Sequence, residues 1–278
     1  MTASPARSGD DRVLAYTRGL SLFIVPFLLV AWVILYVFPD HTAKLWAWPI
    51  PVTMTSMVLA SAYLGGAYFF VRVAFFEKRW HGMATGFLAV TAFASLLGVA
   101  TVVHWDKFFH DRLAFWLWAG LYFGAPFLVI GAWLANRRYA APFSSADVLL
   151  RPLERGVIAV LGVLALAQGV LMFVAPSVVI PLWPWALTPL TCRVMGATYC
   201  LGAAGAGTLF DPRWSSVRLM LQVEAVMLVL MLVAAVRASD ELMPDRALSW
   251  PLLVVVLLML LGSAYLWVIH ERRPRLTG

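Results

Sequence analysis

The sequence predicts an all-α integral membrane protein with eight transmembrane helices, arranged as two parallel four-helix repeats about a pseudo-twofold axis along the membrane normal. Composition is the first observation, since 62% of the 278 residues are apolar and only 13% are charged, whereas soluble domains average about 25% charged residues. The second is a set of apolar runs long enough to cross a bilayer. The third is an internal repeat, because a shift of 137 positions places the first half of the sequence on the second.

The apolar runs define the expected spans. They lie at 14–38, 52–75, 83–104, 113–135, 156–175, 189–210, 217–237 and 250–270. Each can form a helix across about 30 Å of hydrocarbon. Helices are required because lipid cannot satisfy the backbone groups of an open strand edge. No short apolar segment with a small-residue cleavage site follows the polar N-terminus, so we expect the first run to remain as a span.

The repeat is visible in rare residues that keep their order and spacing. Arg18-Gly19 corresponds to Arg155-Gly156, and Leu45-Trp46-Ala47-Trp48 corresponds to Leu182-Trp183-Pro184-Trp185. After a three-residue slip, Phe76-Glu77-Lys78-Arg79-Trp80 meets Phe210-Asp211-Pro212-Arg213-Trp214. Two copies of one unit should fold alike. Each copy has an even number of spans, so both should insert the same way round, as in transporters built from parallel repeats.

The charges in the loops predict the orientation. With the N-terminus inside, the inner segments contain 15 basic residues, and the outer segments contain only Lys44, Lys107, Arg112, Arg237 and Arg246. This excess places both termini on the cytoplasmic side of the cell membrane. The expected organisation is a cytoplasmic tail at 1–13, a first repeat at 14–136, a cytoplasmic linker at 137–154, a second repeat at 155–270 and a cytoplasmic tail at 271–278.

The repeated segments suggest structural roles. The tryptophan segments precede spans two and six on the outer side, where we expect interfacial anchors because indole rings settle at the headgroup level. The alternative is a short re-entrant or surface segment that lines an outer cavity. The inner Phe-acid-x-Arg-Trp boxes are expected to be tight turns with Trp and Arg at the interface, or else a substrate gate. Cys192 and Cys200 lie eight positions apart in one span, too far for a disulfide, and are expected to be core residues.

Small residues concentrate in spans two and six. Span two contains Ser61, Gly65, Gly66 and Ala67, and span six has Gly196, Ala197 and then glycine or alanine at every position from 202 to 207. Small side chains let helices approach closely in lipid. We therefore expect these two spans at the centre of the bundle, with either tight packing or a thin cavity there.

Two charges, Arg193 and Glu224, fall inside the predicted spans, and both lie in the second repeat. A charge within a span costs about 2.5–3.5 kcal/mol on insertion scales, so neither should face lipid unpaired. Spans six and seven are sequence neighbours, and ideal helix rise leaves an axial gap of roughly 12 Å between the two charges. Tyr199, Gln222 or water can bridge that gap. The four residues are expected to form a ligand-binding site; the alternatives are a structural ion pair that fixes helix register, or snorkelling of Arg193 alone.

The outer loop between spans three and four contains His104, Asp106, His110 and Asp111. Imidazole and carboxylate are zinc ligands, but this spacing matches local ligand patterns poorly, so a metal site is a minor alternative to an aromatic interfacial turn with a pH-sensitive edge. No cofactor is expected. A haem needs histidines facing each other at one depth, and the histidines here fall in loops on opposite sides.

These observations favour small-molecule or lipid transport or binding at a polar site in the second repeat. The alternatives are a non-catalytic membrane subunit or scaffold and, less favoured, an intramembrane lipid-modifying enzyme with Glu224 as acid or base; no catalytic residue is assigned. The expected partners are membrane lipids, a small amphipathic ligand and an unidentified membrane protein. The basic residues are spread between the apolar runs, so nucleic-acid binding is rejected.

Overall fold

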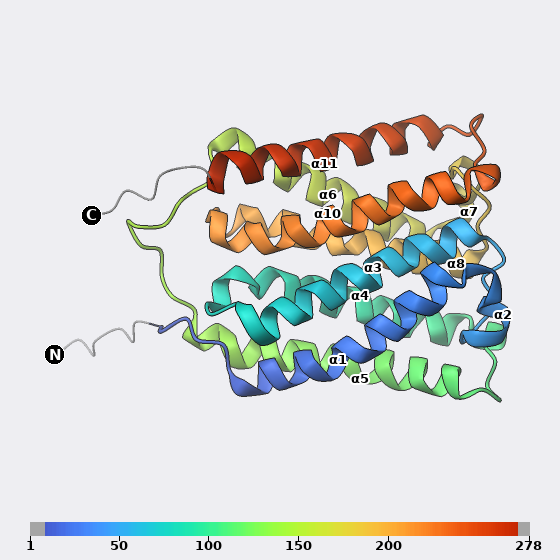
Figure 1. Ribbon diagram of the computed structural model, residues 1–278, viewed down its shortest axis with the longest axis horizontal. Coiled ribbons are helices and arrows are strands. Elements are labelled where there is room, and N and C mark those ends of the chain that lie inside the picture. The colour runs from blue at the N-terminus through green and yellow to red at the C-terminus, as the bar shows by residue number, and fades with distance from the viewer. Residues whose placement is uncertain (1–8, 272–278) are drawn as a thin grey trace.

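A computed structural model describes residues 9–271, and these form a bundle of helices (Figure 1). The helices are α1 (Ala15–Trp32), α2 (Thr42–Leu45), α3 (Thr53–Val71), α4 (Ala84–Val103), α5 (Leu113–Asn136), α6 (Pro152–Val174), α7 (Pro176–Val179), α8 (Pro189–Tyr199), α9 (Ala203–Ala206), α10 (Trp214–Arg237) and α11 (Ser249–Glu271). Within the described range the only β-type pairing is an isolated bridge between Leu149 and Arg213. The all-helical class is therefore confirmed, while the parts of the expected tails at 1–8 and 272–278 lie outside the described residues.

Seven helices are long and apolar enough to cross a membrane. They are Ala15–Val37, Thr53–Phe76, Ala84–Val103, Leu113–Tyr139, Pro152–Val174, Trp214–Arg237 and Ser249–Glu271. The eighth expected span, 189–210, is not one continuous α-helix. It consists of α8, a 3₁₀ turn at Cys200–Gly202, α9 and a second 3₁₀ turn at Gly207–Leu209. Its glycines explain the interruption, because each Gly disfavours a helix by about 1 kcal/mol relative to Ala.

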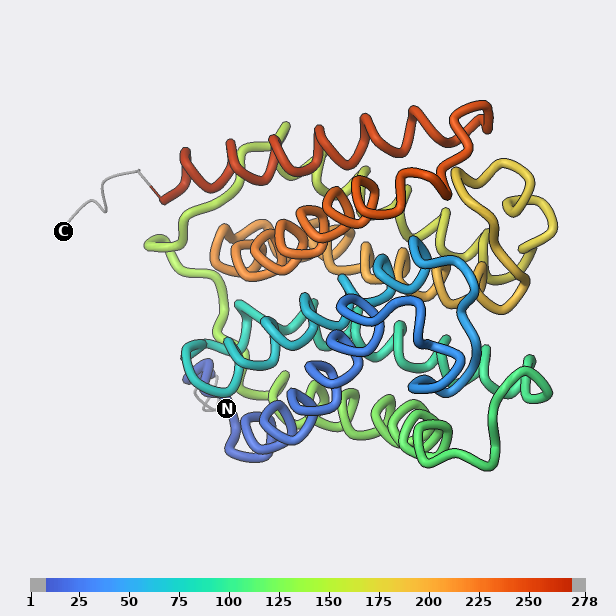
Figure 2. Tube along the Cα trace, turned by 45° about the vertical axis from the view of Figure 1, so that its right-hand side comes forward, coloured from blue at the N-terminus to red at the C-terminus, as the bar shows by residue number. Residues whose placement is uncertain are grey.

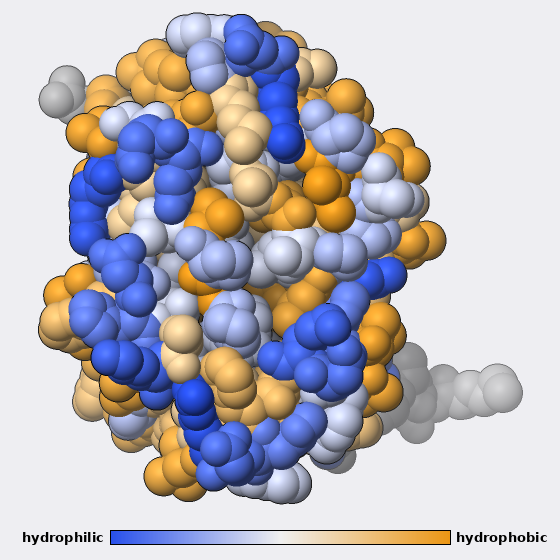
Figure 3. Space-filling view, turned by 90° about the vertical axis from the view of Figure 1, so that its right-hand side faces the viewer, coloured by the Kyte–Doolittle hydropathy of each residue, from blue (hydrophilic) through white to orange (hydrophobic). Residues whose placement is uncertain are grey.

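The two ends of the bundle differ in their elements. α1 begins and α11 ends at one end, which we call the N/C end, and α2 and α7 lie at the other, which we call the α2/α7 end (Figure 1). Figure 3 faces the α2/α7 end and shows hydrophilic residues around its rim and hydrophobic residues along the flanks. Outward side chains within the long helices, such as Phe127 on α5 and Leu261 on α11, are 75% and 67% exposed. A bilayer around the flanks would bury this apolar surface, so the spanning helices would contact lipid.

The two halves of the chain form two adjoining groups of helices. Figure 2 shows residues 9–136 as the lower group and residues 152–271 as the upper group, with the connecting segment passing between them. Across the junction α3 packs against α10, and α4 packs against α8 and α9. α3 is also the most buried of the seven spanning helices. The segments rich in small residues therefore lie at the centre, as expected.

Glycines allow α6 to approach α8 closely. A Cβ atom at Gly196 would lie 2.6 Å from the carbonyl oxygen of Gly169, and a Cβ atom at Gly169 would lie 2.6 Å from the carbonyl oxygen of Gly196. The two helices thus meet backbone to backbone at this point. Cys192 and Cys200, on the same segment, are free and buried, as the sequence predicts. Tight packing accounts for the small residues here.

The repeated tryptophans are buried inside the bundle. Trp46, Trp48, Trp183 and Trp185 are 8%, 1%, 1% and 0% exposed. The expectation that these rings anchor the protein at the headgroups was therefore wrong. Aromatic neighbours surround them instead, with the ring centroid of Trp46 6.0 Å from that of Tyr63 and the centroid of Trp183 5.7 Å from that of Tyr199. Ring-to-ring packing of this kind favours burial over an interfacial position.

Arg18 and Arg155, which the sequence repeat aligns, each donate hydrogen bonds to backbone carbonyl groups at the N/C end of their own half. Nη1 of Arg18 donates to the carbonyl oxygens of Val73 and Ala74, at 2.9 Å in each case. Nε of Arg155 donates to the carbonyl oxygen of Thr208 at 3.0 Å. The repeat, with its three-residue slip, places Arg155 on Arg18 and Thr208 on Ala74. Carbonyl groups that a helix end leaves without partners are satisfied in the same way in both halves.

Two further contacts occur at corresponding positions. The backbone N–H of Trp80 donates to the carbonyl oxygen of Asp11, and the N–H of Trp214 donates to that of Val148, both at 2.8 Å. A shift of 137 places Val148 on Asp11, and the slipped register places Trp214 on Trp80. Each half thus binds its own leading segment.

The first and last long helices of each half are joined by a side-chain contact. Asn136 donates to the hydroxyl of Thr17 in the first half. In the second half, Nε2 of His270 lies 3.0 Å from the Glu154 carboxylate. Glu154 stands at the repeat position of Thr17, and His270 at that of Asn136 in the slipped register. Both halves thus have a contact between this pair of positions, an amide with a hydroxyl in the first half and an imidazole with a carboxylate in the second.

Candidate ligand cavity and polar clusters

The two charges expected to pair, Arg193 and Glu224, have separate surroundings. Nη1 of Arg193 lies 2.7 Å from Nε2 of His104, and Arg193 forms no ion pair with Glu224 in the described structure. The expected pair assumed that consecutive spans six and seven lie side by side. α8 instead packs against α6 and against α4 of the first half, and the hydrogen-bond partner of Arg193, His104, comes from the first half.

The Arg193–His104 contact joins the halves at the α2/α7 end, where His104 follows α4. Burial lowers the pKa of His104, and the positive charge of Arg193 lowers it further. A neutral imidazole can accept the hydrogen bond that the guanidinium donates. Arg193 is thus satisfied without a carboxylate.

A cavity of about 800 Å³ lies between the two halves. Its lining comes from α1, α3, α4 and α5 on one side and from α6, α8, α9, α10 and α11 on the other. Small-molecule sites typically measure about 300–1,000 Å³ and are mostly apolar with a few polar groups. Gly66, Gly86 and Gly202 are among the lining residues. A Cβ atom at each would lie within 3.2 Å of a neighbouring side chain, so these glycines allow close packing at the cavity wall.

Few polar side chains reach the cavity. Glu224 on α10 is joined there by Gln168 on α6 and Tyr199 on α8. Glu224 has no hydrogen-bond or ion-pair partner among residues 9–271, and Nε2 of Gln168 is buried without a partner in the same range. Gln222, the fourth residue of the expected site, is not in the lining, since its Oε1 accepts a hydrogen bond from the Tyr68 hydroxyl at 2.9 Å. The structure thus brings Glu224 and Tyr199 to one cavity and leaves Arg193 and Gln222 outside it.

The cavity opens between α6 and α11. Leu164 on α6 and Leu258 on α11 line it, yet they are 59% and 61% exposed. α6 and α11 make little contact with each other, whereas their counterparts α1 and α5 pack together. The opening therefore lies on the apolar flank of the second half, where lipid tails would be found.

The loop between α4 and α5 does not gather its possible metal-ligand side chains at one point. His104 contacts Arg193, Asp106 pairs with Lys107 at 2.6 Å, and the His110 ring lies against Trp105 with centroids 4.8 Å apart. In the part of the chain that the structure describes, no three His, Cys, Asp or Glu side chains are arranged to hold a metal ion.

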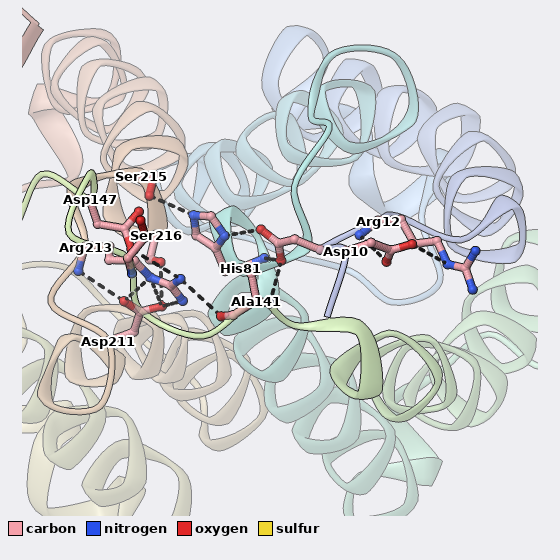
Figure 4. Close-up of polar contacts among 11 residues, drawn as sticks. Asp10, Arg12, His81, Ala141, Asp147, Asp211, Arg213, Ser215 and Ser216 are labelled. Carbon is pink, nitrogen blue, oxygen red and sulfur yellow. Dashed lines mark hydrogen bonds and ion pairs between the residues drawn. The ribbon is translucent and has the colours of Figure 1, made fainter. Parts of the chain in front are cut away.

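A buried cluster at the N/C end was not anticipated from the sequence (Figure 4). His81 is 4% exposed, its Nδ1 contacts the carboxylate of Asp11, and its Nε2 lies 2.8 Å from Oγ of Ser215. Burial acts to raise the pKa of Asp11, but the hydrogen bonds and charge of His81 outweigh it and hold that pKa below its ordinary value. The three residues are far apart in sequence. One sequence observation could have indicated the contact between His81 and Ser215. The shift of 134 positions that aligns the two Phe-acid-x-Arg-Trp boxes also aligns His81 with Ser215, and equivalent positions of two repeats can meet on a twofold axis.

The second Phe-acid-x-Arg-Trp box, Phe210 to Trp214, contains a buried ion pair. Arg213 is 6% exposed, and its Nη2 lies 2.6 Å from the Asp211 carboxylate, which also accepts a hydrogen bond from the Ser216 hydroxyl at 2.6 Å. Burial acts to raise the pKa of Asp211, but the hydrogen bonds from Arg213 and Ser216 outweigh it and lower the pKa. Trp80 and Trp214 are buried as well. The expected interfacial anchoring by these boxes was wrong for both tryptophans and for Arg213.

Comparisons with other proteins give no family for this chain. No protein-family model matches it, and neither a curated protein nor a solved structure does. Its function has to be argued from the geometry of its own sites.

Proposed function

We propose that this protein binds a small amphipathic molecule in the cavity between its halves, and that the molecule enters from the bilayer between α6 and α11. The observation that carries the proposal is the Glu224 carboxylate, which faces an apolar cavity without a protein partner. An uncompensated carboxylate in an apolar setting is costly. A ligand that donates a hydrogen bond or brings a positive charge would remove that cost.

The other lining groups support an amphipathic ligand. The buried Gln168 amide lacks a partner for its Nε2, so it can donate to an oxygen of the same ligand. Tyr199 adds a phenol at the cavity wall. The remaining lining is largely apolar and suits a hydrocarbon body. Transport of such a molecule across or within the membrane is the activity this arrangement best supports.

The proposal includes an eight-crossing, two-repeat architecture with both termini in the cytoplasm. The segment from α8 to the 3₁₀ turn at Gly207–Leu209 would make the eighth crossing. An even number of crossings agrees with the beginning of α1 and the end of α11 at one end of the bundle. The pairing of α3 with α10 and of α4 with α8 and α9 also agrees with a twofold relation. The corresponding contacts of Arg18 and Arg155 support the same relation.

Native mass spectrometry in mild detergent tests the ligand. Wild type should carry a bound small molecule or lipid, and Glu224→Gln should release it. Gly262→Phe should also exclude it, because Gly262 lines the cavity and a Cβ there meets nothing within 4 Å. Gly120→Phe is the matched control, since a Cβ at Gly120 also meets nothing within 4 Å and Gly120 does not line the cavity. A bare mass for wild type, with all variants equally stable, would exclude the binding function and favour a scaffold.

A further inference from the structure

The polar cluster at the N/C end contains a serine, a histidine and an aspartate in a hydrogen-bonded chain. The Ser215 hydroxyl lies 2.8 Å from Nε2 of His81, and Nδ1 of the same ring contacts the Asp11 carboxylate. Asp11 and His81 are buried, whereas Ser215 is exposed. Figure 4 shows the His81 ring directed at Ser215. Ser215 is thus the member of the chain that a reactant can approach.

Asp11 is held firmly in this position. Its carboxylate accepts the backbone N–H of His81 at 3.1 Å, and its carbonyl oxygen accepts the N–H of Trp80 at 2.8 Å. Asp11 is also the only non-glycine residue of the described chain with a positive φ, at 55°. Such backbone positions cost about 1–3 kcal/mol and cluster at functional sites. The ionised carboxylate fixes the imidazole tautomer with hydrogen on Nδ1, so that Nε2 is free to accept a proton.

The geometry points to Ser215 as a nucleophile, activated by His81 and Asp11, for the hydrolysis of carboxylic esters at the N/C end of the bundle. A serine, a general base and a group that orients the base are recognised as a catalytic triad by geometry and not by sequence order. This activity is separate from the cavity and does not depend on the proposed ligand.

Each chemical step can be assigned to a group. His81 Nε2 takes the hydroxyl proton as Ser215 Oγ bonds to the ester carbonyl carbon. The tetrahedral intermediate then breaks its bond to the alcohol oxygen, which leaves with the proton from Nε2. Water, activated by the same nitrogen, attacks the acyl-serine and releases the carboxylic acid, and the proton returns to Ser215. Ser215 lies in the first turn of α10. The N–H groups of Trp214 and Ser216 already donate to Val148 and Arg213, so the N–H of Ser215 itself, which has no acceptor among the described residues, is the group that can stabilise the oxyanion.

The surroundings favour an ester with an anionic head group. Lys78 and Arg79 are exposed and lie three and two residues before His81. The N/C end also carries Arg137 and Arg138 after α5. A negatively charged amphiphile would be attracted to this end while its hydrocarbon part stays among the apolar flanks.

Labelling with a fluorophosphonate tests the proposal on the full-length protein in mild detergent. Wild type should become labelled at Ser215, located by peptide mass spectrometry. Ser215→Ala should abolish the labelling, and Ser145→Ala, which removes an exposed serine of the linker, should leave it unchanged. Asp11→Asn should slow the hydrolysis of p-nitrophenyl esters by about 10⁴-fold, as expected for loss of the group that orients the base.

The unfolding midpoint of each variant separates catalysis from a structural role. Ser215→Ala leaves the buried Nε2 of His81 without its partner at 2.8 Å, so its unfolding midpoint should fall modestly while the protein stays folded at the labelling temperature. If wild-type Ser215 is not labelled, the triad is a structural contact that ties the leading segment to both halves. Labelling that is equally fast in Asp11→Asn and wild type would also overturn the proposal.

Discussion

The contact of Gly169 with Gly196 leads to a quantitative prediction about the packing of α6 on α8. A Cβ added at either position would lie 2.6 Å from the opposite carbonyl oxygen, and ordinary contact begins at 3.4 Å, so the helices would have to separate by about 0.8 Å. Overpacking of this kind costs about 1–3 kcal/mol. Gly169→Ala and Gly196→Ala should each lower the free energy of unfolding by that amount.

The control is alanine at Gly19 or Gly156, where an added Cβ meets nothing within 4 Å. These variants should be neutral or gain up to about 1 kcal/mol, because Ala favours a helix over Gly. Unfolding in mixed micelles with increasing dodecyl sulfate, followed by tryptophan fluorescence, measures all of them. The double variant should lose less than the sum of the single losses, since both changes act on one contact. If Gly169→Ala is as stable as Gly156→Ala, the close approach of the two helices is refuted.

Three other predictions concern individual contacts. Thr55→Val should cost about 1–3 kcal/mol, because it leaves the fully buried Nε1 of Trp185 without its acceptor at 2.8 Å; Thr55→Ser should not, and equal losses would contradict the contact. Acid should unfold the protein: Asp11 and Asp211 have folded-state pKa values below their ordinary 3.8, so their stabilisation is complete above that value and is lost as the pH falls through the folded-state pKa. The melting temperature should therefore be constant near neutrality and fall below about pH 4. A fall that begins near pH 6 would show that a different titrating group controls the acid unfolding. Cysteines placed at positions 107 and 145 should react with impermeant reagents from outside and inside respectively, and the opposite result would reverse the topology.

Much of the fold could be predicted because each long helix is an uninterrupted apolar run. Seven of the eight expected spans are long apolar helices, and hydrocarbon thickness and backbone satisfaction dictate both their length and their type. The exception, 189–210, contains glycines that interrupt the α-helix locally. Hydropathy alone registers glycine as weakly polar and does not reveal a break.

The site was harder to predict because these helices are apolar on all sides. Periodicity then carries no information about which faces meet. Sequence order therefore predicts a partner for Arg193 on the next span, whereas its contact is His104, beyond the end of α4. The tryptophan segments have a composition typical of an interface, but aromatic neighbours such as Tyr63 and Tyr199 bury them. Contacts between residues 11, 81 and 215 depend on how the halves dock, and no local spacing encodes that.

The hydrogen bonds from Trp80 to Asp11 and from Trp214 to Val148 allow the two halves to be exchanged in the order of the sequence. Each of these hydrogen bonds lies within one half of the chain. The segment that precedes the first helix of a half is therefore held by that half alone. Because α1 begins and α11 ends at the same end of the bundle, a circularly permuted chain that starts in the linker before Val148 would retain both hydrogen bonds. In the two-repeat architecture proposed above, His81 and Ser215 hold equivalent positions of the two halves, so their contact would lie on the twofold axis.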